Sequence, residues 1–263
     1  MRLSSQLSLI LLAGFVVAIV AAGFAGRFVG GVVPLAVFAM LSAVNVFFVW
    51  RVTWKWLWRR AFARVRRAFA DEDARRAERL LDRLAPQAPT RQLRTSIAIN
   101  RAMVPILDER WHDAVIALRA VVLGTFDEHW RISYDNALAW ALTHDGALDE
   151  AVGLARATVE RARADARLPA ESRAACIGTL GVALVRAGML EPGLQHLREA
   201  IAAGGMPRHQ SVRHLYMGDA ERGLGHDAAA EAAYREAARL APDSPVGKRA
   251  AERLKSAPPV PYR

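Results

Sequence analysis

The sequence changes character near residue 67, and this change limits what the chain can fold into. Residues 1–50 are almost wholly apolar, with only Arg2 and Arg27 charged. Residues 51–67 then carry seven basic residues and no acidic one. Beyond them the apolar residues recur at helical spacing, without the alternation of β-branched residues that is typical of strands. We therefore predict an all-α protein with a distinct N-terminal segment.

The net charge of +10 is concentrated in that segment. Residues 1–67 hold nine Lys or Arg and no acid, whereas the rest of the chain holds 27 basic and 26 acidic residues. A nearly neutral main domain lacks the basic surface that nucleic-acid-binding domains present. We therefore predict no nucleic-acid partner.

Two apolar runs, Leu7–Ala25 and Val32–Trp50, are long enough to cross a membrane. A helix rises about 1.5 Å per residue, so that about 20 residues span the ~30 Å hydrocarbon core. The short glycine-rich connector between them suits a tight turn. The sequence predicts a two-helix transmembrane hairpin. The alternative is that residues 1–25 form a cleaved signal peptide.

Small residues recur at every fourth position on one face of the first predicted helix, which would let a second helix approach closely. They are Gly14, Ala18, Ala22 and Gly26. Asn45 is the one strongly polar residue deep in the second run, and we expect it to bond within the hairpin or to a partner helix.

Aromatic and basic residues alternate directly after the second run. They are Trp50, Arg51, Trp54, Lys55, Trp56, Trp58, Arg59 and Arg60. Indole rings favour the headgroup region, and cations there attract anionic lipid. The excess of bases beyond the second run predicts that both termini and the main domain are cytoplasmic. The high Arg and Ala content favours a bacterial source, so the predicted location is a bacterial inner membrane.

A turn followed by a small-residue helix recurs along the main domain. Its copies begin at Gly146, Gly188 and Gly225, with a weaker copy at Glu109, and the steps between copies are 37, 42 and 37 residues. Periods of this length are typical of helical solenoids.

These copies resemble the tetratricopeptide repeat (TPR) family, whose helix–turn–helix unit is about 34 residues long. The best copy runs from Ser211 to Ser244, with Met217-Gly218, the turn Leu224-Gly225, Ala230-x3-Tyr234 and Pro242. Glu221 departs from the family pattern, which has an aromatic residue there. The first copy also departs from the pattern, because Pro105 should shorten or kink its first helix.

The resemblance implies a TPR-like α-solenoid of about 3–4 repeats. The predicted parts are a hairpin and collar (1–58), a basic linker and capping helix (59–94), a repeat domain (95–255) and a Pro-rich tail (256–263). In the family, the first helix of each repeat lines a concave groove. This register places in the groove Ile99, Met103, Asn136, Trp140, Gly178, Val182, Val185, Leu215, Asp219 and Arg222. A largely apolar wall suits an amphipathic partner helix.

No motif for catalysis or metal binding stands out. The single cysteine, Cys176, lies within a predicted helix and excludes a disulfide framework within the chain. None of the seven histidines forms the i, i+4 pair with a glutamate that zinc proteases use. We therefore expect no enzyme activity, no cofactor and no metal.

The leading functional prediction is a membrane-tethered scaffold or adaptor that binds a protein partner and helps to assemble a membrane-associated complex. One alternative is a structural subunit whose hairpin docks into a larger membrane complex. Another is an accessory factor of a membrane-associated biosynthetic pathway. The hairpin followed by Lys55-Trp-Leu-Trp-Arg-Arg and helical repeats looks like the haem-biosynthesis-associated membrane proteins of bacteria.

Overall fold

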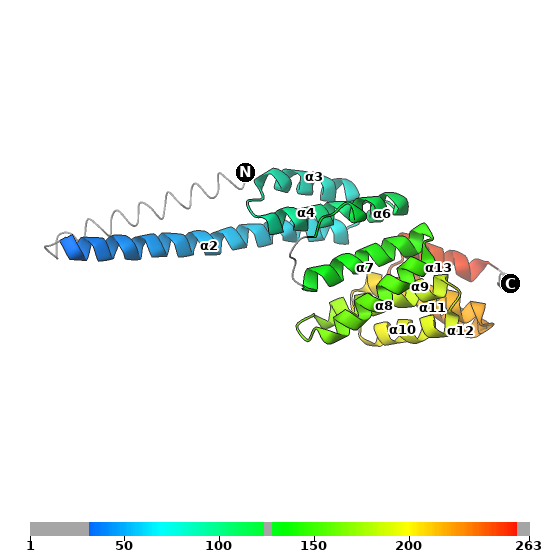
Figure 1. The fold of residues 1–263 in the computed structure, drawn as a ribbon. Coiled ribbons are helices and arrows are strands. Elements are labelled where there is room, and N and C mark those ends of the chain that lie inside the picture. The colour runs from blue at the N-terminus through cyan, green and yellow to red at the C-terminus, as the bar shows by residue number, and fades with distance from the viewer. Residues whose placement is uncertain (1–31, 124–127, 257–263) are drawn as a thin grey trace. The chain divides into compact units, whose positions relative to one another are not determined.

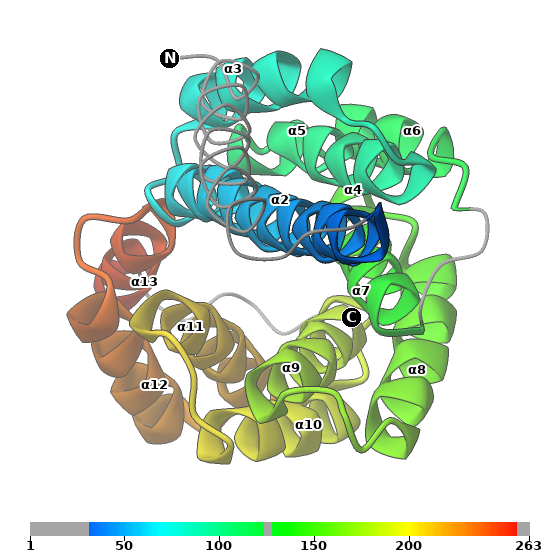
Figure 2. The same cartoon turned by 90° about the vertical axis from the view of Figure 1, so that its left-hand side faces the viewer.

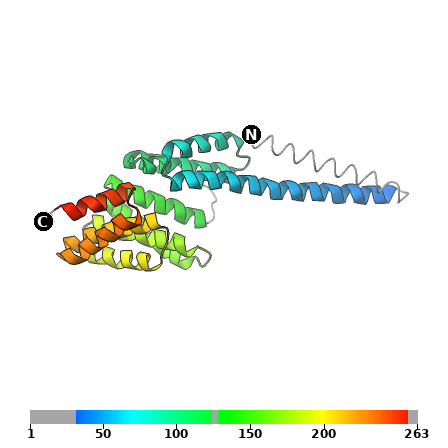
Figure 3. The same ribbon diagram turned by 180° about the vertical axis from the view of Figure 1, so that it is seen from behind.

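The computed structural model describes residues 32–123 and 128–256, and every regular element in those ranges is a helix. The chain forms two compact units, Met1–Ile97 and Ala98–Arg263. Figures 1 and 3 show the helices from opposite sides. The all-α prediction is confirmed for the described residues.

The first unit is built on one long helix. It contains α2 (Val32–Ala70), α3 (Ala74–Leu84), the 3-10 turn η1 (Ala85–Gln87) and the first part of α4 (Arg91–Ala102). The chain turns after α2 through Glu72, whose φ is +55°. Asp73 then caps α3, because its side chain accepts a 2.8 Å hydrogen bond from the Arg76 amide. Helix α2 packs along α3.

The prediction of a membrane anchor is wrong for the part of the chain that the structure describes. No helix there is both long enough and apolar enough to cross a bilayer. The run Val32–Trp50 forms the first part of α2, which continues without a break into the basic segment. The predicted inner-membrane location, and the assignment as a membrane-anchored TPR protein, are contradicted by this finding. The run Leu7–Ala25 and the residues Gly14, Ala18, Ala22 and Gly26 lie outside the described residues, as does the side chain of Asn45.

The predicted membrane collar is divided between the surface and the protein interior. The basic residues Arg51, Lys55, Arg59 and Arg60 are exposed. Trp50 and Trp56 are 36% and 52% exposed, whereas Trp58 is only 4% exposed. Trp58 shares the buried side of α2 with Leu57, Val65 and Ala68. Its indole therefore packs within the protein and does not form part of an exposed belt.

The second unit is a succession of helix pairs, shown in Figure 2. After the end of α4 come α5 (Val104–Leu107), α6 (Trp111–Arg119), α7 (Glu128–Asp145), α8 (Leu148–Ala164), α9 (Ala170–Arg186), α10 (Leu190–Ala202), α11 (Pro207–Gly223), α12 (Asp227–Leu240) and α13 (Pro245–Lys255). As expected from Pro105, the first copy is interrupted: α4 stops at Ala102 and α5 is a single turn.

The predicted turn residues adopt the left-handed backbone that a sharp reversal requires. Gly146, Gly188 and Gly225 have φ values of +96°, +78° and +81°. Glu109 stands at the equivalent place in the first copy and has a φ of +54°. A residue with a β-carbon is uncommon in this region, so the first turn is strained relative to the others.

The two helices of a pair meet at glycines. A β-carbon at Gly181 of α9 would lie 2.8 Å from the Leu197 side chain of α10. At Gly218 of α11 it would lie 2.5 Å from the ring of Tyr234 on α12. Both partners are fully buried, so each glycine provides the space that a large side chain of the paired helix fills.

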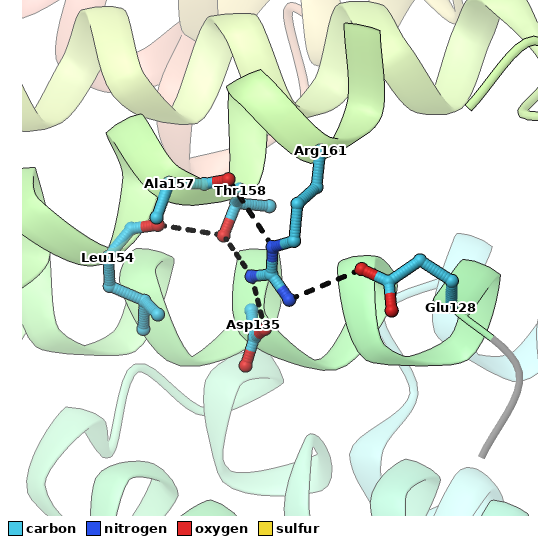
Figure 4. A network of polar contacts seen from close by, with 6 residues as sticks. All are labelled: Glu128, Asp135, Leu154, Ala157, Thr158 and Arg161. Atoms are coloured by element: carbon cyan, nitrogen blue, oxygen red, sulfur yellow. Dashed lines mark hydrogen bonds and ion pairs between the residues drawn. The ribbon is translucent and has the colours of Figure 1, made fainter. Parts of the chain in front are cut away.

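Charged contacts add to the packing of α7 against α8 (Figure 4). The Arg161 guanidinium donates a 2.5 Å hydrogen bond to Asp135 and lies 3.5 Å from Glu128. Asp135 is only 17% exposed in its side chain. The contact is therefore shielded from solvent on one side and fixes the register of the two helices.

The pairs curve so that their first helices lie on the inside. Helix α9 contacts both α7 and α11, and α11 contacts α13, besides their neighbours in sequence. The second helices α8, α10 and α12 make their main contacts with helices adjacent in sequence. This is a solenoid-like arrangement, as the repeat period predicts. We call the side formed by α7, α9, α11 and α13 the inner face.

Candidate functional site

Four ring side chains from three helices meet at the inner face. We call Trp111, Trp140, His144 and Tyr216 the aromatic cluster. The His144 ring lies 4.4 Å from Trp111 of α6 and 4.2 Å from Trp140, between ring centroids. The Tyr216 ring of α11 meets it edge-on at 6.2 Å. All four residues are partly exposed, so the cluster combines a packed base with an accessible surface.

His144 is held by two hydrogen bonds that define its neutral form. Its Nδ1 lies 2.9 Å from the Trp140 carbonyl oxygen, so this nitrogen carries the proton and donates it. Its Nε2 lies 3.0 Å from the Tyr216 hydroxyl, which donates to it. Burial lowers the pKa of His144 to about 4, and the nearby Arg186 and Arg249 act in the same direction. The ring therefore stays uncharged at neutral pH.

The lowered pKa of His144 predicts a loss of stability in acid. Its pKa is about 4 in the folded protein against 6.5 for the ordinary group, so the unfolded chain binds a proton first as the pH falls. The free energy of unfolding should fall by ~3 kcal/mol on this account between pH 6.5 and pH 4. Urea titrations of the wild type and His144→Gln across that range measure the difference. Parallel pH profiles would contradict the prediction.

Four arginines of the inner face lie near either Tyr216 of the aromatic cluster or Asp219, and we call Arg186, Arg222, Arg249 and Arg253 the inner arginines. Arg186, at the end of α9, is hydrogen-bonded to Tyr216, and Arg249 of α13 acts electrostatically on the same tyrosine. Arg249 also pairs with Glu109 at 2.8 Å. This pair joins residues 140 positions apart, so α13 returns to the start of the second unit.

The remaining two inner arginines lie around Asp219. Arg253 is 3.4 Å from the Asp219 carboxylate, which also accepts a 2.8 Å hydrogen bond from the Tyr234 hydroxyl. Arg222 lies over the Tyr234 ring at 4.7 Å and donates to the Arg253 carbonyl oxygen. Burial raises the pKa of Asp219 although the arginines oppose this shift. The inner face thus carries more positive than negative charge at this end.

The residues predicted to line a groove separate into two sets. Ile99, Gly178, Val182, Val185 and Leu215 are buried in the hydrophobic core, with Val182 only 1% exposed. Met103, Asn136, Trp140, Asp219 and Arg222 are partly exposed. Only the second set can contact a partner directly.

The sequence reasoning missed Trp111, His144, Tyr216 and three of the inner arginines. His144 follows Trp140 by four residues and so lies on the same side of α7, a signal that was available. Arg249 and Arg253 lie on the capping helix α13, which has no repeat register to follow. Tyr216 joins the cluster only because the solenoid curves.

Two further residues of the second unit, Cys176 and Glu221, are buried. Cys176 is 3% exposed, and burial raises its pKa to about 11, which makes the thiol a poor nucleophile. Glu221, which replaces the family's aromatic residue, is buried and pairs with Arg198 and His226 at 2.7 and 2.9 Å. Within the described ranges, no group of His, Cys, Asp and Glu could hold a metal ion.

Comparisons with known proteins identify a similar fold. No protein-family model and no curated protein matches the chain. A crystal structure of Bacillus thuringiensis PlcR in complex with the peptide PapR7 and DNA matches with a TM-score of 0.65 and 14% identity, over 88% of this chain and 87% of that one. The structure of PlcR in its apo form matches with a TM-score of 0.67 and 13% identity, over 87% and 88%. At this identity the likeness shows an all-helical, solenoid-like fold alone.

Proposed function

We propose that the chain is a helical-repeat scaffold that binds a protein or peptide partner through its inner face, and that its role is binding rather than catalysis. The observation that carries the proposal is the aromatic cluster. Large rings with polar edges, partly exposed and held by hydrogen bonds, are the residues that dominate protein–protein recognition. Here three helices supply them at one place.

The fold comparison supports the same class of partner. The similar structure of PlcR contains a bound peptide and DNA. A peptide partner is consistent with the aromatic cluster of this chain. The predicted functions that depend on a membrane tether are not carried forward, since no spanning helix is found among the described residues.

Trp140 provides the most direct test by substitution. It lies in the aromatic cluster and also packs at the edge of the core around Val182 and Val185. We expect Trp140→Ala to weaken partner binding about thirtyfold, because truncation of a central aromatic residue costs about 2 kcal/mol or more. The partner is first identified by capture on the purified protein, and its Kd is then measured by calorimetry.

Met206→Ala is the matched control, because Met206 is 48% exposed and lies in the connection before α11. It should leave the Kd unchanged. Urea unfolding of each variant separates loss of binding from loss of folding. A Kd for Trp140→Ala equal to that of the control would exclude the aromatic cluster from the interface.

A further inference from the structure

The end of the inner face that holds α9, α11 and α13 is rich in guanidinium groups. All four inner arginines lie there, whereas their direct carboxylate partners are Asp219 and Glu109. Arg186 is exposed, and Arg253 is 51% exposed in its side chain. Two cations therefore remain in excess, and at least two of the four are open to solvent.

One hydrogen-bond donor of the inner arginines lacks an acceptor among the described residues. The Nε of Arg222 is buried and has no hydrogen-bond partner among the described residues. Buried donors are usually satisfied, and one that is not raises the free energy of the folded state. Because this nitrogen is shielded from solvent, a partner reaches the Arg222 guanidinium through its other nitrogens.

The inner arginines come from three helices and form two groups, with Arg186 and Arg249 near Tyr216, and Arg222 and Arg253 around Asp219. Arg186 ends α9, Arg222 lies in the last turn of α11, and Arg249 and Arg253 lie on α13. Two groups of cations on neighbouring helices suit several carboxylates along an extended chain better than one small anion. Guanidinium groups bind carboxylates in a bidentate geometry.

We propose that the inner arginines bind an acidic peptide segment through its side-chain carboxylates, with its apolar side chains resting on the aromatic cluster. The inference rests on the proposed function and adds the chemistry of the partner. The His144 ring is neutral, so the arginines supply the positive charge next to the aromatic cluster. Charge complementarity then selects acidic segments and repels basic ones.

The test uses fluorescence anisotropy with the full chain and labelled eight-residue peptides amidated at the C-terminus. One peptide alternates Glu with Leu and Trp; a second has Gln for each Glu, and a third has Lys. We expect the acidic peptide to bind at least about tenfold more tightly than the Gln peptide, and more weakly as salt is raised. Equal binding of the Glu and Gln peptides, or no binding of the acidic one, would overturn the proposal.

Two double variants test whether the inner arginines are responsible for binding the acidic peptide. Arg186→Gln with Arg253→Gln removes two exposed inner charges and should weaken the acidic peptide about tenfold. Arg156→Gln with Arg235→Gln removes two exposed charges from α8 and α12 and should change the Kd by less than about twofold. An equal loss in both double variants would indicate unspecific attraction and contradict the inner site. If Trp140→Ala weakens the captured partner while the inner double variant does not, the scaffold function stands and the acidic preference is wrong.

Discussion

Replacement of Gly218 by valine should destabilise the second unit by about 3 kcal/mol, because the core there has no room for a side chain. A β-carbon at this position would lie 2.5 and 2.7 Å from two carbons of the Tyr234 ring. The ring cannot move away easily. It is completely buried, its hydroxyl is held by Asp219, and Arg222 covers its face. Chemical unfolding in urea measures the change.

Gly153→Val is the matched control for this substitution. Gly153 lies in α8, is exposed, and has nothing within 4 Å of the place where a β-carbon would stand. Valine has a slightly better helix propensity than glycine, so the control should be neutral or more stable by about 0.4 kcal/mol. Similar losses at both positions would show that the effect is a general intolerance of valine in these helices and not a local clash.

Loss of the Arg213 side chain should cost about 3 kcal/mol, through both unmade hydrogen bonds and a cavity. Arg213 of α11 is only 4% exposed. Its Nη1 donates to the carbonyl oxygens of Ala200 and Gly204 at 2.7 and 2.8 Å. These carbonyls end α10, where a positive charge also complements the helix dipole. Burial lowers the pKa of this guanidinium, which shows that its desolvation works against the favourable contacts.

Arg213→Ala is compared with Arg235→Ala, which removes an exposed arginine that pairs with Glu231 at 3.0 Å. An exposed pair of this kind contributes little, so the control should stay within about 0.5 kcal/mol of the wild type. Thermal and urea unfolding of both variants give the two values. An Arg213→Ala protein as stable as the control would mean that the desolvation cost cancels the two hydrogen bonds.

Repeat spacing predicted the second unit well because its signals are local. Gly146, Gly188 and Gly225 mark turns, and the pairing of Gly218 with Tyr234 follows from the spacing within one repeat. The prediction from composition was wrong in the N-terminal part, because composition does not show which residues pack inside the protein. The apolar run before Trp50 suggested a separate membrane span, but it is part of one helix that also buries Trp58 in the protein.

The inner face was predicted only in part, because the repeat register identifies the side of a helix but not how far neighbouring helices cover it. Val182 and Leu215 have the expected register and are buried by the adjacent pairs. The contact of His144 with Tyr216 joins residues 72 positions apart. It depends on the curvature of the whole unit, which no local pattern encodes.

Site-specific photocrosslinking tests the binding role of the inner face most directly. A photoreactive amino acid is placed at Asn136, which is partly exposed and lies four residues before Trp140 on α7, or at Glu160, exposed on α8. Irradiation in the presence of the captured partner should give a covalent adduct from position 136 and none from position 160. Adducts from position 160 alone would contradict binding at the inner face.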